Sequence, residues 1–323
     1  MTLNTVALPQ AGEGEGEGEG EHSRTIVFSH ANGFPAATYR QLFEHWRGAG
    51  WRVVALPKFG HDSRFAVTSN WPQLRDELLH FIDVQRAAPA YLVGHSLGGY
   101  LSLLAASRRP EVARGIVLLD SPVLPNWMGR TVQFFKASGI GERFSPGHVS
   151  KRRREHWPSV DAARAHFAAK PVFARWAEGV LEDYLACGLE SAPRPTNTSS
   201  APQGGLSSPA KPDLLKTASS GETAQHLSFS RRIETTIYNT LPHHLARLLR
   251  THPPHCPVAF VAGTRSEEMR RVGLSEVKRI ARLRITLLDG SHLFPMEQPQ
   301  ATANAVLHWL TRFDAARASR PAA

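Results

Sequence analysis

Cysteine is scarce in this sequence: the 323 residues include only Cys187 and Cys256. Two thiols so far apart predict neither a disulfide framework nor a cysteine-rich metal cluster, and they suit a reducing compartment. No run approaches the roughly 18 apolar residues of a membrane span, and no basic start followed by an apolar segment marks the first twenty residues. These absences predict a soluble, cytoplasmic protein without stable membrane insertion.

The sequence has no long block of basic residues, although its formal net charge is +10. A Gly-Glu repeat at residues 12–21 contributes five glutamates, so the rest of the chain carries +15. Residues 227–284 hold 11 Lys and Arg against 4 Asp and Glu, interspersed with apolar residues. Nucleic-acid binding is typical of basic side chains clustered on one face or stripe. We therefore expect no nucleic-acid partner.

Two segments have too few large apolar residues to pack. Residues 1–21 end in the Gly-Glu repeat, and residues 191–226 are dominated by Ser, Pro, Thr, Ala and Gly. Such compositions do not offset the entropy lost when a backbone is ordered. We predict a disordered tail at 1–21 and a disordered insertion at 191–226, which leaves 266 residues for a core.

Short apolar runs alternate with helical patterns in the remaining chain. This alternation predicts βαβ units and a mostly parallel sheet flanked by helices. The expected strands are Thr25 to Ser29, Trp51 to Leu56, Tyr91 to Val93, Gly115 to Leu119, Val258 to Ala262 and Arg284 to Leu288. The rhythm of strands stops after Ser121 and resumes near Pro257. We therefore predict a core of residues 22–120 and 251–323, with a mainly helical insertion at 121–250.

The segment Gly94-His95-Ser96-Leu97-Gly98 follows an expected strand and begins an expected helix. A serine in such a G-x-S-x-G turn has a strained backbone and presents its hydroxyl, while the glycines let strand and helix approach closely. A Gly-rich turn that merely closes a βα unit does not explain a nucleophile between the glycines. Ser96 is therefore the candidate nucleophile.

A serine hydroxyl is a weak nucleophile at neutral pH and needs a base. Among the 16 histidines, His292 follows the expected strand Arg284 to Leu288 and precedes the final helix. Functional groups of open α/β sheets gather at the carboxyl ends of the strands. The order of nucleophile first and base last favours His292 over a solvated loop histidine.

Together these segments resemble the α/β-hydrolases that carry a cap. The resemblance rests on Ser29 to Pro35, Phe59 to Ser63, the turn at Ser96, Leu118 to Pro122, and Gly290 to His292 followed by Glu297 and Pro299. It covers roughly residues 22–120 and 251–315. It implies the α/β-hydrolase fold, a helical cap over the site, and an acyl-enzyme mechanism that requires no cofactor.

The sequence departs from the resemblance at the acid. Many family members carry an aspartate in a G-x-x-D pattern after the penultimate strand, but here that place reads Gly263-Thr264-Arg265-Ser266. A subset carries the acid after the strand that follows the nucleophile's helix, where this chain has Asp120. A right-handed crossover also brings Asp120 to the same sheet edge as Ser96. We expect Asp120 to be the acid and keep Glu267 as the alternative.

An oxyanion hole in this family combines two backbone N–H groups. The resemblance implies Leu97, the residue after the nucleophile, and one residue of the loop after the first strand. The loop motif aligns in two ways, with Asn32 or with Phe34 as the donor. We favour Asn32, which leaves His30 and Gly33 to shape the loop.

The insertion is rich in aromatic residues, which suit helical core and an apolar inner face over the site. These residues are Trp127, Phe134, Phe135, Trp157, Phe167, Phe173 and Trp176. The basic run Lys151, Arg152, Arg153 and Arg154 is typical of a solvated helix face, with attraction of an acidic substrate as the alternative. Adjacent His243 and His244 lack a third ligand at a suitable spacing, so no metal site is expected.

We therefore expect a serine hydrolase that cleaves an ester, thioester or related acyl bond of a small, largely apolar substrate. A serine nucleophile counts against the dehalogenases and epoxide hydrolases of this fold, which use aspartate there. Two alternatives stay open. One is a non-catalytic ligand-binding protein on the same fold, and the other is a cofactor-free carbon–carbon hydrolase or perhydrolase with the same triad.

Overall fold

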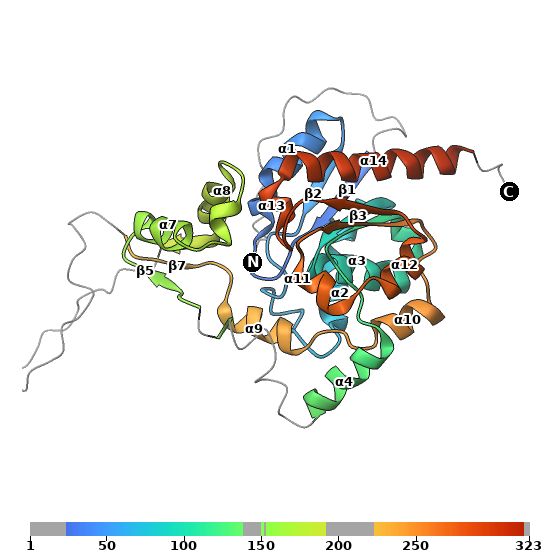
Figure 1. The fold of residues 1–323 in the computed structure, drawn as a ribbon, viewed down its shortest axis with the longest axis horizontal. Helices are drawn as coiled ribbons and strands as arrows, with labels where there is room; N and C mark the ends of the chain where they lie inside the picture. Colours follow the sequence, from blue (N-terminus) through green and yellow to red (C-terminus); the bar gives the residue numbers. More distant parts are fainter. Residues whose placement is uncertain (1–23, 138–149, 152, 192–222, 320–323) are drawn as a thin grey trace, which may run out of the picture.

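The computed structural model describes residues 24–137, 150–151, 153–191 and 223–319 (Figure 1). The predicted tail at 1–21 lies outside these residues. Only the ends of the predicted insertion at 191–226 lie inside them, and both belong to strands: Ser191 ends β6 (Leu189–Ser191), and Gln225 begins β7 (Gln225–Leu227). Residues 192–222 lie outside the described part of the chain, so the disordered insertion stays a prediction.

A six-stranded parallel sheet forms the centre of the molecule. Its strands lie in the order β2-β1-β3-β4-β8-β9. Their bounds are β1 Thr25–Ser29, β2 Arg52–Ala55, β3 Ala90–His95, β4 Ala113–Leu119, β8 Val258–Gly263 and β9 Ile285–Leu288. All five strand pairs are parallel. The predicted α/β fold is confirmed, and each expected strand exists within one or two residues of its predicted bounds.

Helices cover both faces of this sheet (Figure 1). Alternate residues of β3 show the division: Leu92 belongs to one buried apolar cluster, and Tyr91 and Val93 belong to the other. The first cluster includes residues of α2 (Pro72–Val84), α3 (Leu97–Arg108), α10 (Leu245–Thr251) and α12 (Ser275–Ala281). The second includes residues of α1 (Arg40–Gly48) and α14 (Pro299–Ala318). Burial on both faces is why these strands appear as continuous apolar runs in the sequence.

The insertion between β4 and β8 contains helices and a small sheet. Its helices are α4 Asn126–Ala137, α7 Val160–Ala168, α8 Val180–Gly188 and α9 Arg231–Asn239. The sheet is antiparallel, with the order β5-β7-β6 and β5 at His156–Trp157. The sequence predicted a mainly helical insertion and missed this sheet, because strands of two or three residues are too short to show a period-2 pattern. No helix in the described ranges is both long and apolar enough to span a bilayer.

Short elements complete the chain. They are the 3-10 helices η2 Ala36–Tyr39, η3 Pro110–Val112 and η4 Phe173–Arg175, and the helices α11 Glu267–Val272 and α13 Phe294–Glu297. Two of them matter for the site because they follow strands at the carboxyl edge of the sheet. Helix α11 follows β8, and α13 follows β9. The loops before these two helices therefore approach the ends of β3 and β4.

Aromatic side chains form the inside of the insertion. Phe167 is fully buried, and its ring contacts Trp157, Phe173 and Tyr184 at centroid distances of 5.2, 4.9 and 5.2 Å. Phe34, from the loop after β1, contacts Tyr184 and Trp176, each at 5.9 Å. The predicted apolar interior therefore also holds the insertion against the core. Trp127 is an exception, with 66% of its surface exposed.

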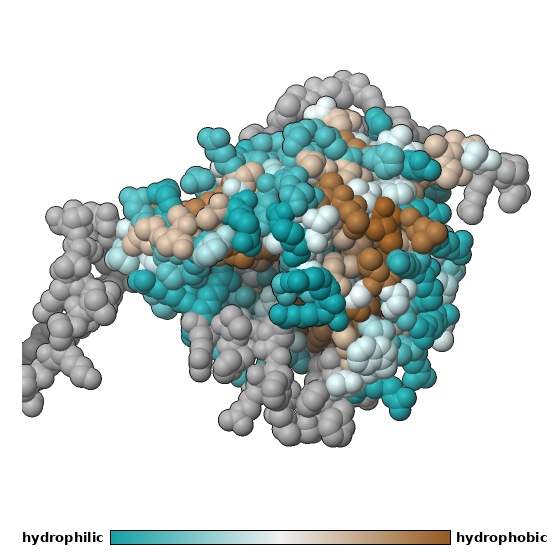
Figure 2. Space-filling view, in the orientation of Figure 1, coloured by the Kyte–Doolittle hydropathy of each residue, from teal (hydrophilic) through white to brown (hydrophobic). Residues whose placement is uncertain are grey.

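Exposed leucines lie at the side of the large sheet where β9 is the outermost strand. Leu283 and Leu287, before and within β9, are 77% and 60% exposed. Figure 2 shows an apolar surface in this part of the molecule, between α14 and α12. Leu92 in β3 is fully buried, so the sheet contains leucines at both extremes of burial.

We predict that Leu92→Ala lowers the free energy of unfolding by about 2–5 kcal/mol, because it leaves a cavity in the closed core. Leu287→Ala is the matched control, since it removes the same atoms from an exposed site and is expected to cost less than about 1 kcal/mol. Urea denaturation measures both. Equal losses in the two variants would contradict the assignment of β3 to the centre of the core.

Candidate active site

Ser96 lies at a sharp turn between β3 and α3. Its backbone angles are φ 52° and ψ −110°, which non-glycine residues rarely adopt. A Cβ on Gly94 would lie 2.3 Å from the backbone of Gly98, and one on Gly98 would lie 2.0 Å from the carbonyl oxygen of Ser29. The two glycines are therefore needed for close approach of strand and helix, as the G-x-S-x-G pattern predicts.

The turn fixes Ser96 at the carboxyl edge of the sheet. Its N–H donates to the carbonyl oxygen of Leu119, the last residue of β4, at 3.0 Å. The next residue, Asp120, donates its own N–H to Val261 in β8 at 2.9 Å. The ends of three neighbouring strands are thus held together, and Ser96 and Asp120 leave adjacent strands at one edge.

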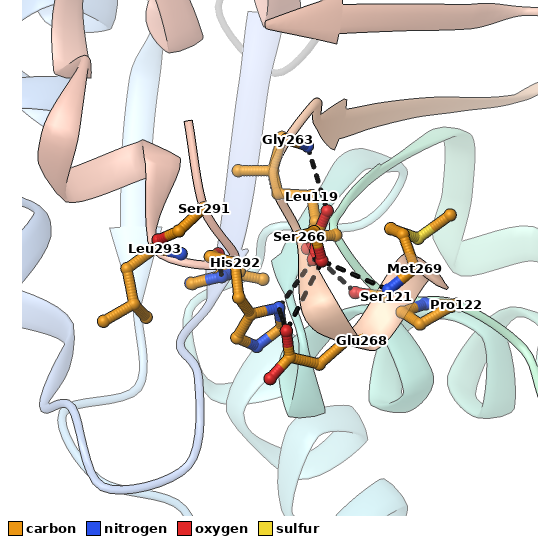
Figure 3. Close-up of polar contacts among 12 residues, drawn as sticks. Leu119, Ser121, Pro122, Gly263, Ser266, Glu268, Met269, Ser291, His292 and Leu293 are labelled. Atoms are coloured by element: carbon orange, nitrogen blue, oxygen red, sulfur yellow. Dashed lines mark hydrogen bonds and ion pairs between the residues drawn. The ribbon is translucent and has the colours of Figure 1, made fainter. Parts of the chain in front are cut away.

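Asp120 is fully buried and accepts hydrogen bonds from Gly263, Ser266 and His292. Figure 3 labels these three donor residues. The His292 ring donates from Nδ1 to Oδ2 at 2.6 Å, and the Ser266 hydroxyl donates to the same oxygen at 2.5 Å. The N–H of Gly263 donates to Oδ1 at 3.0 Å. Because Nδ1 carries the proton toward Asp120, Nε2 of His292 keeps its lone pair. This is the tautomer that a general base requires.

Ser266 occupies the place where the G-x-x-D pattern of the family carries aspartate. Its hydroxyl donates to Asp120 and accepts the N–H of Met269 at 3.2 Å, which also caps α11. Glu267, the alternative acid, instead pairs with Arg270 and Arg271 on the exposed surface of α11. The structure therefore brings Asp120, and not Glu267, into contact with His292.

A second carboxylate lies beside the histidine. Glu268 Oε2 is 3.7 Å from Nδ1 of His292, and the two side chains face each other in Figure 3. Burial lowers the pKa of His292, but the hydrogen bond and charge of Asp120, with a further contribution from Glu268, outweigh it and raise that pKa above its ordinary value. Sequence reasoning did not identify Glu268, because its approach depends on how α11 begins.

His95 joins the serine turn to the histidine loop. Its Nε2 bonds to the carbonyl oxygen of His292 at 2.9 Å, so Nε2 carries the proton. Its Nδ1 then accepts from the Tyr39 hydroxyl at 2.7 Å, and the Tyr39 oxygen accepts the N–H of Ala31 at 3.2 Å. Burial holds the pKa of His95 well below its usual range, so the ring stays neutral. The residue before Ser96 thereby positions the backbone of His292.

The side chains of Ser96 and His292 form no direct hydrogen bond with each other in the described part of the chain. Their connection runs through His95, whose ring centroid lies 5.1 Å from that of His292. Catalytic hydrogen bonds are often long before substrate binds, so the separation does not remove Ser96 from the site. The sequence offered one signal for His95, its position inside the G-x-S-x-G motif.

Glu297 holds the loop that carries His292. Its carboxylate accepts the N–H and the hydroxyl of Ser291 at 2.9 and 2.6 Å. Arg175 of the insertion lies 3.3 Å from the same carboxylate. The loop is thus fixed on both sides of His292, by Glu297 at Ser291 and by His95 at the His292 carbonyl.

Backbone N–H groups of the loop after β1 distinguish the two oxyanion candidates. Phe34 donates its N–H to the carbonyl oxygen of Ala31 at 3.2 Å. The backbone N–H of Asn32 has no acceptor among the described residues, and neither has that of Leu97, the first residue of α3. The Asn32 side-chain Nδ2 donates to the carbonyl oxygen of Glu234 at 3.0 Å, while its buried Oδ1 has no hydrogen-bond partner among the described residues. This geometry favours the backbone of Asn32 over that of Phe34.

His30 fixes the conformation of the loop after β1. Its Nδ1 donates to the carbonyl oxygen of Ala31 at 2.8 Å, and its Nε2 accepts the N–H of Phe59 at 2.9 Å. Burial lowers the pKa of His30 to about 4, so this histidine is neutral at physiological pH. It connects the loop after β1 to the loop after β2 and has no free nitrogen for chemistry.

An ion pair of the insertion covers the same loop. Arg153 Nη1 lies 3.0 Å from Glu234 Oε2, and a Cβ on Gly33 would lie 3.2 Å from that Arg153 nitrogen. Arg153 also donates to the Tyr184 hydroxyl. Arg154 donates to the carbonyl oxygen of His156, and Arg152 lies outside the described residues. The basic run is therefore not simply a solvated face, since Arg153 is buried beside the site.

One group of side chains has metal-ligand chemistry in the described residues. Ligand atoms of Asp120, Glu268 and His292 lie within 4.8 Å of one another. However, Nδ1 of His292 is already bonded to Asp120, and a cation there would have to displace that proton and the Ser266 hydroxyl. The arrangement suits a proton held between histidine and carboxylate better than a metal ion.

Comparison with known proteins agrees with this geometry. A family model described as the alpha/beta hydrolase family matches residues 26–305. Monoglyceride lipase of Mus musculus is 33% identical over 108 residues, 31% of this chain and 36% of that enzyme. Epoxide hydrolase B of Mycobacterium tuberculosis is 30% identical over 118 residues, 35% of this chain and 32% of the relative. The chain thus matches about a third of the length of these relatives.

Solved structures resemble a much larger part of the chain. E-2-(acetamidomethylene)succinate hydrolase has a TM-score of 0.64 at 17% identity, covering 89% of this chain and 91% of its own. A thioesterase domain from the curacin biosynthetic pathway has a TM-score of 0.59 at 17% identity, covering 88% and 90%. At these identities the likeness shows the fold. With the family model matching most of its length, the chain belongs to the α/β hydrolase family.

Proposed function

We propose that this protein is a serine hydrolase that cleaves an ester, thioester or related acyl bond. The observation that carries the proposal is the buried Asp120–His292 hydrogen bond, at 2.6 Å, at the same sheet edge as the strained Ser96 turn. A buried carboxylate that orients a histidine has a clear purpose beside a nucleophile. In a protein that only binds a ligand, this arrangement would have no evident use.

The proposed reaction begins with attack by Ser96 Oγ on the acyl carbon, while Nε2 of His292 takes the hydroxyl proton. Asp120 stabilises the imidazolium that forms. The backbone N–H groups of Leu97 and Asn32 stabilise the oxyanion, since both lack other acceptors. His292 then donates the proton to the leaving group, and a water molecule, activated by the same histidine, hydrolyses the acyl-enzyme. The chemistry needs no cofactor.

The Arg153–Glu234 ion pair, which covers the loop after β1, favours a neutral substrate. The Arg153 guanidinium lies next to Gly33, but Glu234 compensates its charge at 3.0 Å. The aromatic ring of Phe34 contacts Trp176 and Tyr184 in the aromatic interior of the insertion. Since no uncompensated cation faces the loop among the described residues, we propose a small, largely apolar acyl group. A monoglyceride lipase and a thioesterase domain among the relatives are compatible with acyl substrates.

Two other activities share this geometry. Carbon–carbon hydrolysis and perhydrolysis use the same triad, and a binding protein would retain the fold. The likeness to an epoxide hydrolase does not add epoxide hydrolysis to these alternatives. Epoxide hydrolases of this fold use an aspartate as the nucleophile, and this chain has Ser96 at that place. A fluorophosphonate probe distinguishes enzyme from binding protein, since it labels only an activated serine.

We predict that Ser96→Ala abolishes both fluorophosphonate labelling and hydrolysis of p-nitrophenyl butyrate, with a rate loss on the order of 10⁴-fold or more. The turn does not need the hydroxyl, so the circular dichroism spectrum and the melting temperature should be retained. Ser69→Ala is the control, because this exposed serine lies outside the site, and it should keep both labelling and activity. Substantial turnover by Ser96→Ala would refute the proposed nucleophile.

We predict that Asp120→Asn lowers kcat by roughly 10⁴-fold, because His292 loses the carboxylate that fixes its tautomer. Glu267→Gln, on the exposed surface of α11, should keep a near-normal rate. The double variant Asp120→Asn/Ser266→Asp should recover part of the lost activity, since Ser266 already contacts the same carboxylate. A near-normal rate in Asp120→Asn together with a large loss in Glu267→Gln would contradict this assignment and identify Glu267 as the acid.

We predict that Glu268→Gln moves the acidic limb of the pH profile of kcat/KM to lower pH. The limb reports the pKa of His292, which must be neutral to act as a base, and the Glu268 charge helps to raise that pKa. Without this charge the histidine is neutral at lower pH. Glu267→Gln is the matched control, because its carboxylate does not contact His292, and its profile should coincide with that of the unmodified protein. An unchanged or alkaline-shifted limb in Glu268→Gln would contradict this role.

A further inference from the structure

A hollow lies at the edge of the sheet where the central strands begin, away from the candidate active site. Its volume is about 790 Å³, and Pro89, Ala113 and Val258 line it, next to or at the starts of β3, β4 and β8. Ser96 and Asp120 follow the opposite ends of these strands. Strands of six or seven residues, roughly 20 Å, therefore separate the hollow from the candidate active site.

Arginines dominate the wall of this hollow. Arg114, Arg279, Arg282, Arg284 and Arg317 line it. Arg279 pairs with Glu276 at 2.9 Å, but the other four form no ion pair with any carboxylate in the described residues. The acidic residue of the lining, Glu111, is paired with Arg109 at 2.9 Å. The hollow therefore contains several uncompensated positive charges.

Helix ends account for only part of this charge. Arg317 lies in the last turn of α14 and Arg279 in that of α12, where the helix dipole stabilises cations. Arg282 is the C-cap residue of α12, and Arg284 donates to the carbonyl oxygen of Ala281 at the same helix end, so the dipole stabilises these two as well. Arg114, in β4, lies at no helix end. Four neighbouring guanidinium groups repel one another, and an anion bound among them would remove that cost.

The guanidinium groups are partly fixed by the backbone. Arg114 donates from Nε to the carbonyl oxygen of Pro89 at 3.0 Å, and Arg284 donates from Nη1 to that of Ala281 at 3.4 Å. Each retains further N–H donors in the planar fork that binds phosphate oxygens in pairs. Side chains held in this way lose little entropy when they bind an anion.

The remaining wall is apolar and suits a ring. Leu249, Ile280 and Phe313 contribute side chains, and Pro253, Pro254 and Pro257 contribute a stiff segment. Figure 1 shows α10, α12 and α14, from which the three apolar side chains and several arginines come, on one side of the molecule. A volume of this size accommodates a small molecule. A nucleic acid instead requires a basic stripe along the surface, whereas these arginines line one hollow.

We propose that this hollow binds a small molecule that carries two linked phosphate groups and an apolar ring system, of the nucleoside diphosphate class. The guanidinium groups of Arg114, Arg282, Arg284 and Arg317 contact the phosphates, and the Leu249, Ile280 and Phe313 wall contacts the ring. The site uses part of the basic excess of residues 227–284, which the proposed hydrolase chemistry does not need.

Isothermal titration calorimetry of the full chain with ADP and with inorganic pyrophosphate tests the proposal. Both ligands should bind, ADP more tightly, and the double variant Arg284→Gln/Arg317→Gln should weaken ADP at least about tenfold. The matched control is Arg130→Gln/Arg232→Gln, which removes the same charge outside the lining and should leave affinity unchanged. Hydrolysis of p-nitrophenyl butyrate should be the same in both double variants, because Ser96 lies at the other edge.

Three outcomes would overturn the proposal. The first is that neither ligand binds at millimolar concentration, and the second is that the control variant weakens ADP as much as the variant of the hollow. The third is that a short single-stranded RNA binds more tightly than ADP and loses affinity with the same arginines, which would assign the hollow to nucleic acid. Each result leaves the hydrolase proposal unaffected, since none depends on Ser96.

Discussion

The buried carboxylate of Asp120 is the constraint on which the geometry of the site depends. A fully buried charge is costly unless several donors surround it, and removing one partner of such a group typically costs about 3–5 kcal/mol. Here the donors come from the end of β8, the start of α11 and the loop after β9. Two segments far from Asp120 in sequence, residues 263–266 and the loop that carries His292, must therefore converge on one side chain. The same requirement that stabilises the carboxylate gives His292 its orientation.

A second, neutral network supports this arrangement from the side of the serine. Ala31, Tyr39, His95 and the carbonyl of His292 form one chain of hydrogen bonds, and each proton position follows from the carbonyl at its end. The chain joins the oxyanion loop, the serine turn and the histidine loop. Since the low pKa of His95 keeps its ring neutral, the network holds these parts together without adding charge next to His292. A change at Tyr39 would therefore act on all three parts at once.

The fold and the main site residues could be predicted from sequence because they depend on patterns that parallel sheets require. Asp120 could be preferred over Glu267 because a crossover connection fixes which edge a strand end reaches. Other contacts could not be predicted, since they depend on side-chain directions in loops. Ser266 looked like a missing acid, although its hydroxyl supports the acid that replaced it. Likewise, Asn32 is favoured over Phe34 as the oxyanion donor only because a turn occupies the Phe34 N–H, and the sequence does not show that turn.

The two edges of the sheet impose different electrostatic demands, and this explains why basic residues could gather at one of them. At the carboxyl edge, the carboxylates of Asp120 and Glu268 raise the pKa of His292, so a nearby uncompensated arginine would oppose the base. Glu234 neutralises Arg153 there. At the other edge no catalytic pKa depends on local charge, and strands of six or seven residues, roughly 20 Å, separate the two regions. Positive charge at that edge can therefore serve a separate ligand without disturbing the proposed base.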